Sequence, residues 1–194
     1  TEVILHAYTE WGSDCVNHFR GMFAFALWDK QNQKVFCAVD RFGIKPFYYS
    51  DQNESFAFAS EVRALLKADV VKRELDMDAI ASFLSFGSVQ APMTILKNVS
   101  ALLPAHTLTY SLTDNVVETH RYWAPTIDSQ KTKYQVKESL EASIRDHLVS
   151  DVPLGLFLSG GVDSSALAIL AHCQGDVDLR AFNVSFGEEE YAEG

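Results

Sequence analysis

The chain has few basic residues, few cysteines and no long apolar run, and each shortage excludes a class of protein. It carries 16 Lys and Arg against 26 Asp and Glu, a net charge of −10. Surfaces that bind nucleic acid need clustered Lys and Arg, so a nucleic-acid partner is not expected. No apolar stretch approaches the roughly 20 residues that cross a bilayer, and the first residues do not resemble a signal peptide. We therefore expect no membrane partner.

The cysteines do not predict a structural cross-link. Cys15, Cys37 and Cys173 are an odd number at wide spacings, which predicts neither a disulfide framework nor a zinc site. A reducing, cytoplasmic location is the simplest interpretation. The apolar fraction of 47% and the charged fraction of 22% are those of an ordinary globular protein.

The first part of the chain alternates short apolar runs with turns, which predicts antiparallel hairpins covered by helices. Gly12 is a stop signal for the first helix, and the segment 30–33 is a hairpin turn. The predicted helices span residues 3–11, 14–19, 61–68 and 77–86, and the predicted strands span 22–28, 34–40, 45–50, 55–59, 106–110 and 116–122.

The second part has a different pattern. Residues 124–131 are polar and aperiodic and indicate a boundary between domains at 1–124 and 125–194. A helix follows with Val136, Leu140, Ile144 and Leu148 on one face and a Glu141–Arg145 pair on the other. A strand at 154–158, a glycine loop, a helix and a strand at 179–186 then predict a parallel nucleotide-binding α/β fold.

The glycine loop is Ser159-Gly160-Gly161-Val162-Asp163-Ser164-Ser165. Its glycines let the backbone approach a ligand, and the free N–H groups of the following helix favour an anion such as phosphate. No lysine follows the glycines, so the loop is not a Walker A motif. Asp163 would repel a polyphosphate unless a cation lay between them, which implies Mg²⁺. The alternative is a Ser/Gly-rich turn that caps a core helix, with Asp163 interacting with the helix dipole.

This loop resembles the PP-loop of the N-type ATP pyrophosphatases, which release AMP and pyrophosphate from ATP. Residues 20–26 (RGMFAFA), 40–49 (DRFGIKPFYY) and 59–66 (ASEVRALL) resemble the class II glutamine amidotransferase domain. Residues 102–106 and 150–155 add to the match. Together the stretches resemble one family, the glutamine-hydrolysing asparagine synthetases of the B type.

The resemblance implies a fold and a reaction. The fold is an α+β Ntn-hydrolase-like antiparallel layered domain followed by an α/β PP-loop (adenine nucleotide α-hydrolase-like) parallel-sheet domain. The first domain releases ammonia from glutamine. The second activates the aspartate side chain with ATP and Mg²⁺ as an AMP ester, and ammonia displaces the AMP. The implied small-molecule partners are therefore glutamine, aspartate and ATP. The resemblance leaves open whether the protein forms a homodimer.

The resemblance also assigns site residues. Ser159, Gly160, Gly161, Asp163, Ser164 and Ser165 match the pyrophosphate-binding loop, with Asp163 as the Mg²⁺ contact. Leu158 and Val184 match positions that contact the nucleoside; the alternative for both is plain β-core. In the first domain, Gly43 is expected to supply a turn, Asp40 and Arg41 a buried ionic contact, and His106 a hydrogen-bonded turn residue.

Other family residues are not matched. The nucleophilic cysteine, with the Arg, Asn-Gly pair and Asp that hold glutamine, belongs before Thr1, and the residues that grip the acyl-adenylate belong after Gly194. The three cysteines present cannot substitute, because the thiol needs a free α-amine as its base. Thr1 opens a helix rather than a strand, which disfavours it as a nucleophile. We expect a fragment of a longer protein, inactive by itself.

Two further functions stay open. One is a paralogue that amidates a sugar acid or peptide, or closes a β-lactam, since no acceptor pocket is matched. The other is a non-catalytic nucleotide-binding scaffold, although an intact Asp163 disfavours complete loss of ATP chemistry.

Overall fold

The computed structural model describes residues 1–52, 55–126, 136–175 and 179–184. The chain divides into two compact units, Thr1–Thr126 and Ile127–Gly194, which we treat separately. Among the described residues, no helix is both long enough and apolar enough to cross a membrane.

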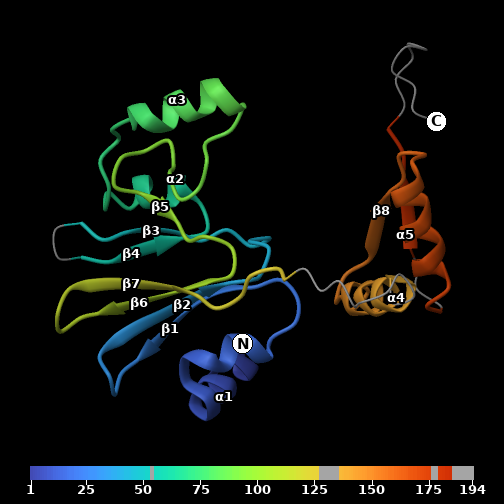
Figure 1. The fold of residues 1–194 in the computed structure, drawn as a ribbon, viewed down its shortest axis with the longest axis horizontal. Coiled ribbons are helices and arrows are strands. Elements are labelled where there is room, and N and C mark those ends of the chain that lie inside the picture. The colour runs from blue at the N-terminus through green and yellow to red at the C-terminus, as the bar shows by residue number, and fades with distance from the viewer. Residues whose placement is uncertain (53–54, 127–135, 176–178, 185–194) are drawn as a thin grey trace. The chain divides into compact units, whose positions relative to one another are not determined.

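The first unit is built in layers (Figure 1). A four-stranded antiparallel sheet of order β1–β2–β6–β7 lies beside a three-stranded antiparallel sheet of order β4–β3–β5. The elements are α1 (Glu2–Trp11), the 3-10 helix η1 (Gly12–His18), β1 (Ala24–Asp29), β2 (Lys34–Val39), β3 (Tyr48–Ser50), β4 (Ala57–Ala59), α2 (Val62–Lys67), α3 (Met77–Phe86), β5 (Ser100–Ala101), β6 (His106–Ser111) and β7 (Val116–Arg121).

Alternation along β2 divides the unit into two cores. Successive side chains of a strand point to opposite faces. Phe36 and Ala38 face α1 and η1, where they pack with Ala7, Cys15 and Val16. Each of these five side chains is at most 5% exposed, so the helical layer is anchored by apolar burial.

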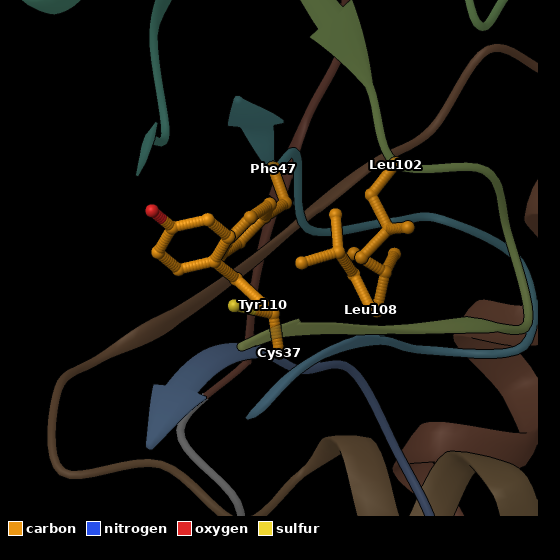
Figure 2. Packing of buried hydrophobic residues seen from close by; sticks show 6 residues of the cluster. Cys37, Phe47, Leu102, Leu108 and Tyr110 are labelled. Carbon is orange, nitrogen blue, oxygen red and sulfur yellow. The ribbon is translucent and has the colours of Figure 1, made fainter. Parts of the chain in front are cut away.

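The opposite face of β2 forms the core between the two sheets. Cys37 packs there with Phe47, Leu102, Leu108 and Tyr110, as Figure 2 shows. The aromatic ring of Tyr110 stacks on Phe56 at 4.8 Å, which extends this core toward β4. Cys15 and Cys37 are both fully buried, and their thiols are free.

A third cluster lies on the outer side of the second sheet. Leu65 of α2 packs there with Val71, Leu96 and Val99 and against partly buried side chains of β3 and β4. α3 begins at Asp76, whose carboxylate accepts the backbone N–H groups of Asp78 (2.9 Å) and Ala79 (3.2 Å). These two bonds satisfy N–H groups that a helix start leaves free.

Most predicted elements of this unit are present. Helix 77–86 matches residue for residue, and the first helix ends before Gly12. The predicted strand pairs 22–28 with 34–40, 45–50 with 55–59 and 106–110 with 116–122 all form as antiparallel pairs. Several other bounds shift by one or two residues, and three larger differences stand out. The short second helix is a 3-10 helix, β3 and β4 are shorter than predicted, and β5 was not predicted at all.

The second unit contains α4 (Val136–His147), β8 (Leu154–Phe157), α5 (Val162–His172) and β9 (Leu179–Phe182). β8 and β9 pair in parallel, Leu154 with Leu179 through Phe157 with Phe182, as predicted for a strand–helix–strand unit. The predicted Glu141–Arg145 pair is wrong: Glu141 lies 3.8 Å from Lys137, and Arg145 donates to Gln174 (3.2 Å). The predicted strand at 179–186 is shorter in the structure, because β9 ends at Phe182 and residues 183–184 are not in a strand. Positions 127–131 of the predicted boundary and 185–186 of the predicted strand lie outside the described residues.

Candidate nucleotide-binding site

The predicted strand, glycine loop and helix follow one another in the second unit. β8 ends at Phe157, the loop follows, and α5 begins at Val162 with Gly161 as its N-cap. Gly160 has φ +86°, a left-handed conformation that side chains with a Cβ rarely adopt. The turn from strand to helix therefore depends on glycine at this position.

The loop is braced from within by two serines. The Ser164 hydroxyl donates to the Gly161 carbonyl (3.1 Å) and accepts the Ser159 backbone N–H (3.3 Å). The two hydroxyls of Ser159 and Ser164 lie 3.2 Å apart. These contacts join the first and sixth residues of the loop, so the structure brings the predicted Ser159, Gly161 and Ser164 together.

The start of α5 offers uncapped N–H groups. Among the described residues, no side chain accepts the N–H groups of Val162 to Ser164. The Gly161 N–H donates to the Ser159 hydroxyl (3.5 Å), and the Ser165 N–H donates to the Gly161 carbonyl (3.1 Å). Asp163 lies in this first turn and is exposed. A helix of 11 residues with free first-turn N–H groups attracts an anion through hydrogen bonding and the helix dipole.

Leu158 and Val184 lie at the ends of the two parallel strands. Leu158 N–H donates to Phe182 (2.8 Å), which extends the β8–β9 ladder by one residue. Its carbonyl accepts the side-chain amide of Asn183 (2.7 Å). Val184 lies two residues beyond β9 and is 70% exposed. Asn183 was not predicted, because a single polar residue after a strand gives no sequence signal.

The metal expectation rests on Asp163. Among the described residues, no group of three His, Cys, Asp or Glu side chains lies close enough to hold a metal ion. Mg²⁺ in nucleotide sites takes one or two carboxylates together with phosphate oxygens and water. One exposed carboxylate beside uncapped N–H groups fits that donor set, so Asp163 would hold the ion only together with the phosphates.

A second polar centre lies in the first unit at Asp40, which is 1% exposed. Its carboxylate accepts four backbone N–H groups at 3.1–3.2 Å, from Phe23, Phe42, Ile44 and Lys45. The predicted ionic contact with Arg41 is wrong. The Arg41 guanidinium instead donates to the carbonyls of Phe19 (3.2 Å) and Asn17 (3.4 Å).

The turn beside Asp40 follows the prediction for glycine. Gly43 has φ +65°, and a Cβ there would lie 2.8 Å from Cγ of Pro104. His106 Nδ1 lies 2.8 Å from the Pro104 carbonyl, as expected for a histidine held by hydrogen bonding. Asp40, Gly43 and Pro104 thus join two loops at one end of the sheets.

The two cysteines of the first unit, Cys15 and Cys37, have raised pKa values. Burial raises the pKa of the Cys37 thiol to about 12, and burial also raises the pKa of Cys15. Thiols with raised pKa values carry little thiolate near neutral pH and react slowly. Both are core residues, in agreement with the sequence interpretation.

Comparison with known proteins identifies both units. Residues 1–123 match the family model of the glutamine amidotransferase domain, and residues 135–194 match that of asparagine synthase. These are the two halves that the amidotransferase-like stretches and the glycine loop indicated.

The similar proteins include glutamine-hydrolysing asparagine synthetases and one protein named as an amidase. The chain is 37% identical to asparagine synthetase (glutamine-hydrolyzing) 3 of Bacillus subtilis strain 168, over 98% of the chain and 32% of that protein. It is 35% identical to a putative asparagine synthetase (glutamine-hydrolyzing) 2 of Methanocaldococcus jannaschii, over 100% of the chain and 39% of that protein. It is also 30% identical to amidase chry2 of Gibberella zeae, over 86% of the chain. The chain spans about a third of the length of the curated relatives it matches.

Proposed function

Because the chain belongs to the glutamine amidotransferase domain family and continues into an asparagine synthase domain, we propose that it serves the ATP-dependent synthesis of asparagine from aspartate. Glutamine supplies the ammonia, and the aspartate side chain is activated as β-aspartyl-AMP with release of pyrophosphate. The two domains span 1–124 and 125–194 in this proposal. It rests on the family and on the geometry of the loop between β8 and α5.

The observation that carries the ATP half is the braced loop at the end of β8. Gly160 is left-handed, the Ser159 and Ser164 side chains hold the loop together, and the first turn of α5 has no side-chain cap. A preformed row of N–H donors binds phosphate oxygens without paying for loop ordering at the moment of binding. An anionic leaving group such as pyrophosphate is stabilised by the same donors.

Each loop residue then has a role. The N–H groups of Val162 to Ser164 bind the pyrophosphate portion of ATP, with Gly160 permitting the turn. Ser159, Ser164 and Ser165 support the loop and add hydroxyl contacts. Asp163 holds Mg²⁺, which neutralises phosphate charge when bound. Leu158 and Val184, exposed or half-exposed at the strand ends, contact the nucleoside.

Aspartate-dependent release of pyrophosphate tests this proposal. The full-length protein, incubated with ATP, MgCl₂ and candidate acids, is expected to release pyrophosphate with aspartate. Release only with a sugar acid or another carboxylate would contradict asparagine synthesis and favour a paralogue with a different acceptor. The relative named as an amidase gives a reason to include such acids. Absence of release with every acid would favour a non-catalytic nucleotide-binding scaffold.

A substitution at Asp163 tests the metal contact. Asp163→Ala is expected to abolish Mg²⁺-dependent ATP turnover and to leave the far-UV spectrum unchanged, since the side chain is exposed. Glu138→Ala on α4 removes another exposed acid of the same unit and serves as the control. Retained turnover in Asp163→Ala would remove this residue from the mechanism.

A further inference from the structure

We propose that Asn183 is a positioning residue of the nucleotide loop, a role that rests on the proposed ATP-dependent function. Its side-chain Nδ2 donates to the Leu158 carbonyl at 2.7 Å, across 25 residues of sequence. Asn183 directly follows β9, and Leu158 directly follows β8. The bond therefore joins the ends of the two parallel strands at the point where the loop begins.

The bond acts on one particular peptide group. A peptide unit is planar, so the Leu158 carbonyl and the Ser159 N–H turn together. The carbonyl side of this unit is held by Asn183, and the N–H side donates to the Ser164 hydroxyl (3.3 Å). This first peptide of the loop is thus held from β9 on one side and from α5 on the other.

The ladder fixes the residue before that peptide. Leu158 N–H donates to the Phe182 carbonyl (2.8 Å), one residue beyond the end of β8. Without the Asn183 amide, the Leu158 carbonyl would be left to water and the peptide could rotate relative to the ladder. The Ser159 N–H would then lose its alignment with Ser164, and the contacts that join the two ends of the loop would loosen.

The consequence is a preordered loop. A loop that is fixed before the ligand arrives gains affinity, because binding no longer pays for ordering it. Asn183 acts through Leu158 and Ser159 and touches no reacting atom in this proposal. Asn183 is therefore expected to affect the affinity for ATP and not the release of ammonia from glutamine.

The chemistry of the bond selects the test variants. Asn183→Ala removes the donor. Asn183→Asp keeps the size of the side chain but places a carboxylate oxygen against the Leu158 carbonyl, so that attraction becomes repulsion. Gln174→Ala is the matched control: Gln174 also uses its side-chain amide in a contact, with Arg145, but it follows the far end of α5, roughly 16 Å along the helix from the loop.

The experiment is equilibrium binding of MgATP and steady-state kinetics in the full-length protein. We expect Asn183→Ala to weaken ATP binding about three- to tenfold, the range for loss of one hydrogen bond. Asn183→Asp should weaken it at least as much, with the KM for ATP raised in both while kcat, glutaminase activity and the KM for aspartate stay within twofold. Gln174→Ala should bind ATP like the wild type.

Three results would overturn the inference. Wild-type affinity in a folded Asn183→Ala variant removes the positioning role. Restoration of affinity by Asn183→Asp shows that the side chain matters only for its volume. An equal loss of ATP affinity in Gln174→Ala shows a general structural effect. If the wild-type protein itself binds no ATP, the proposed function fails, and that outcome differs from all three.

Discussion

At the scale of single residues, Gly43 and Gly87 make a matched pair. Both are left-handed, with φ +65° and +73°. A Cβ on Gly43 would lie 2.8 Å from Pro104, whereas a Cβ on Gly87 would have no neighbour within 4 Å. The two positions therefore share the backbone strain of a substitution and differ in the steric clash.

Alanine at these two positions separates strain from clash. Gly87→Ala is expected to lower the free energy of unfolding by about 1 kcal/mol, the cost of a left-handed side-chain residue. Gly43→Ala adds contact with Pro104 and is expected to lower it by about 3 kcal/mol. Urea unfolding monitored by tryptophan fluorescence measures both. Equal losses would show that Pro104 moves aside without cost.

The buried thiol of Cys37 predicts a loss of stability in alkali. Burial raises its pKa to about 12, from a reference value of 9.0. As the pH rises, the Cys37 thiol ionises at a lower pH in the unfolded chain than in the folded protein. The contribution of this thiol to the free energy of unfolding is therefore fully present below pH 9 and is lost between pH 9 and 12. At pH 11 the loss from this thiol is about 2–3 kcal/mol.

Cys37→Ala isolates this contribution. The variant is expected to be less stable than the wild type at pH 8, because it leaves a small cavity. The difference in unfolding free energy should shrink by pH 11, since only the wild type carries the thiol and other titrating groups cancel. A difference that does not change between pH 8 and 11 would contradict the burial of this thiol.

At the scale of elements, the sequence predicts best those elements whose ends carry clear signals. Helix 77–86 is marked by Asp76 at its start and Gly87 at its end, and the structure has those bounds. The strand predicted at 45–50 shortens to β3 because Lys45 N–H donates to the Asp40 carboxylate instead of a neighbouring strand. β5 has two residues, too few for any periodicity.

The cap of α3 gives a prediction at this scale. Asp76→Ala removes the acceptor of two backbone N–H groups and is expected to lower the unfolding free energy by about 1 kcal/mol. Asp76→Asn, which keeps a side-chain acceptor, should stay close to the wild type. Hydrogen exchange of the amides of Asp78 and Ala79 should accelerate in the alanine variant alone. Unchanged exchange there would show that the cap does not hold the first turn.

At the scale of the molecule, the sequence predicts local pairing but not the order of strands. The hairpins β1–β2 and β6–β7 join neighbours in sequence, whereas β2 pairs with β6 through contacts such as Cys37 with Leu108. That pairing depends on the core between the sheets, which no local pattern encodes. In the candidate site, the order of strand, loop and helix was readable, while the contact from Asn183 was not.

Asp40 has a consequence for the tolerance of this domain to mutation. Its four partners are backbone N–H groups, and three of them belong to Phe42, Ile44 and Lys45, whose side chains are exposed. A backbone N–H can donate whatever the side chain of its residue. Proline is the exception, because it has no backbone N–H. A complete single-substitution library selected for folding should therefore accept almost any residue except proline at these three positions. Position 40 itself should accept only aspartate.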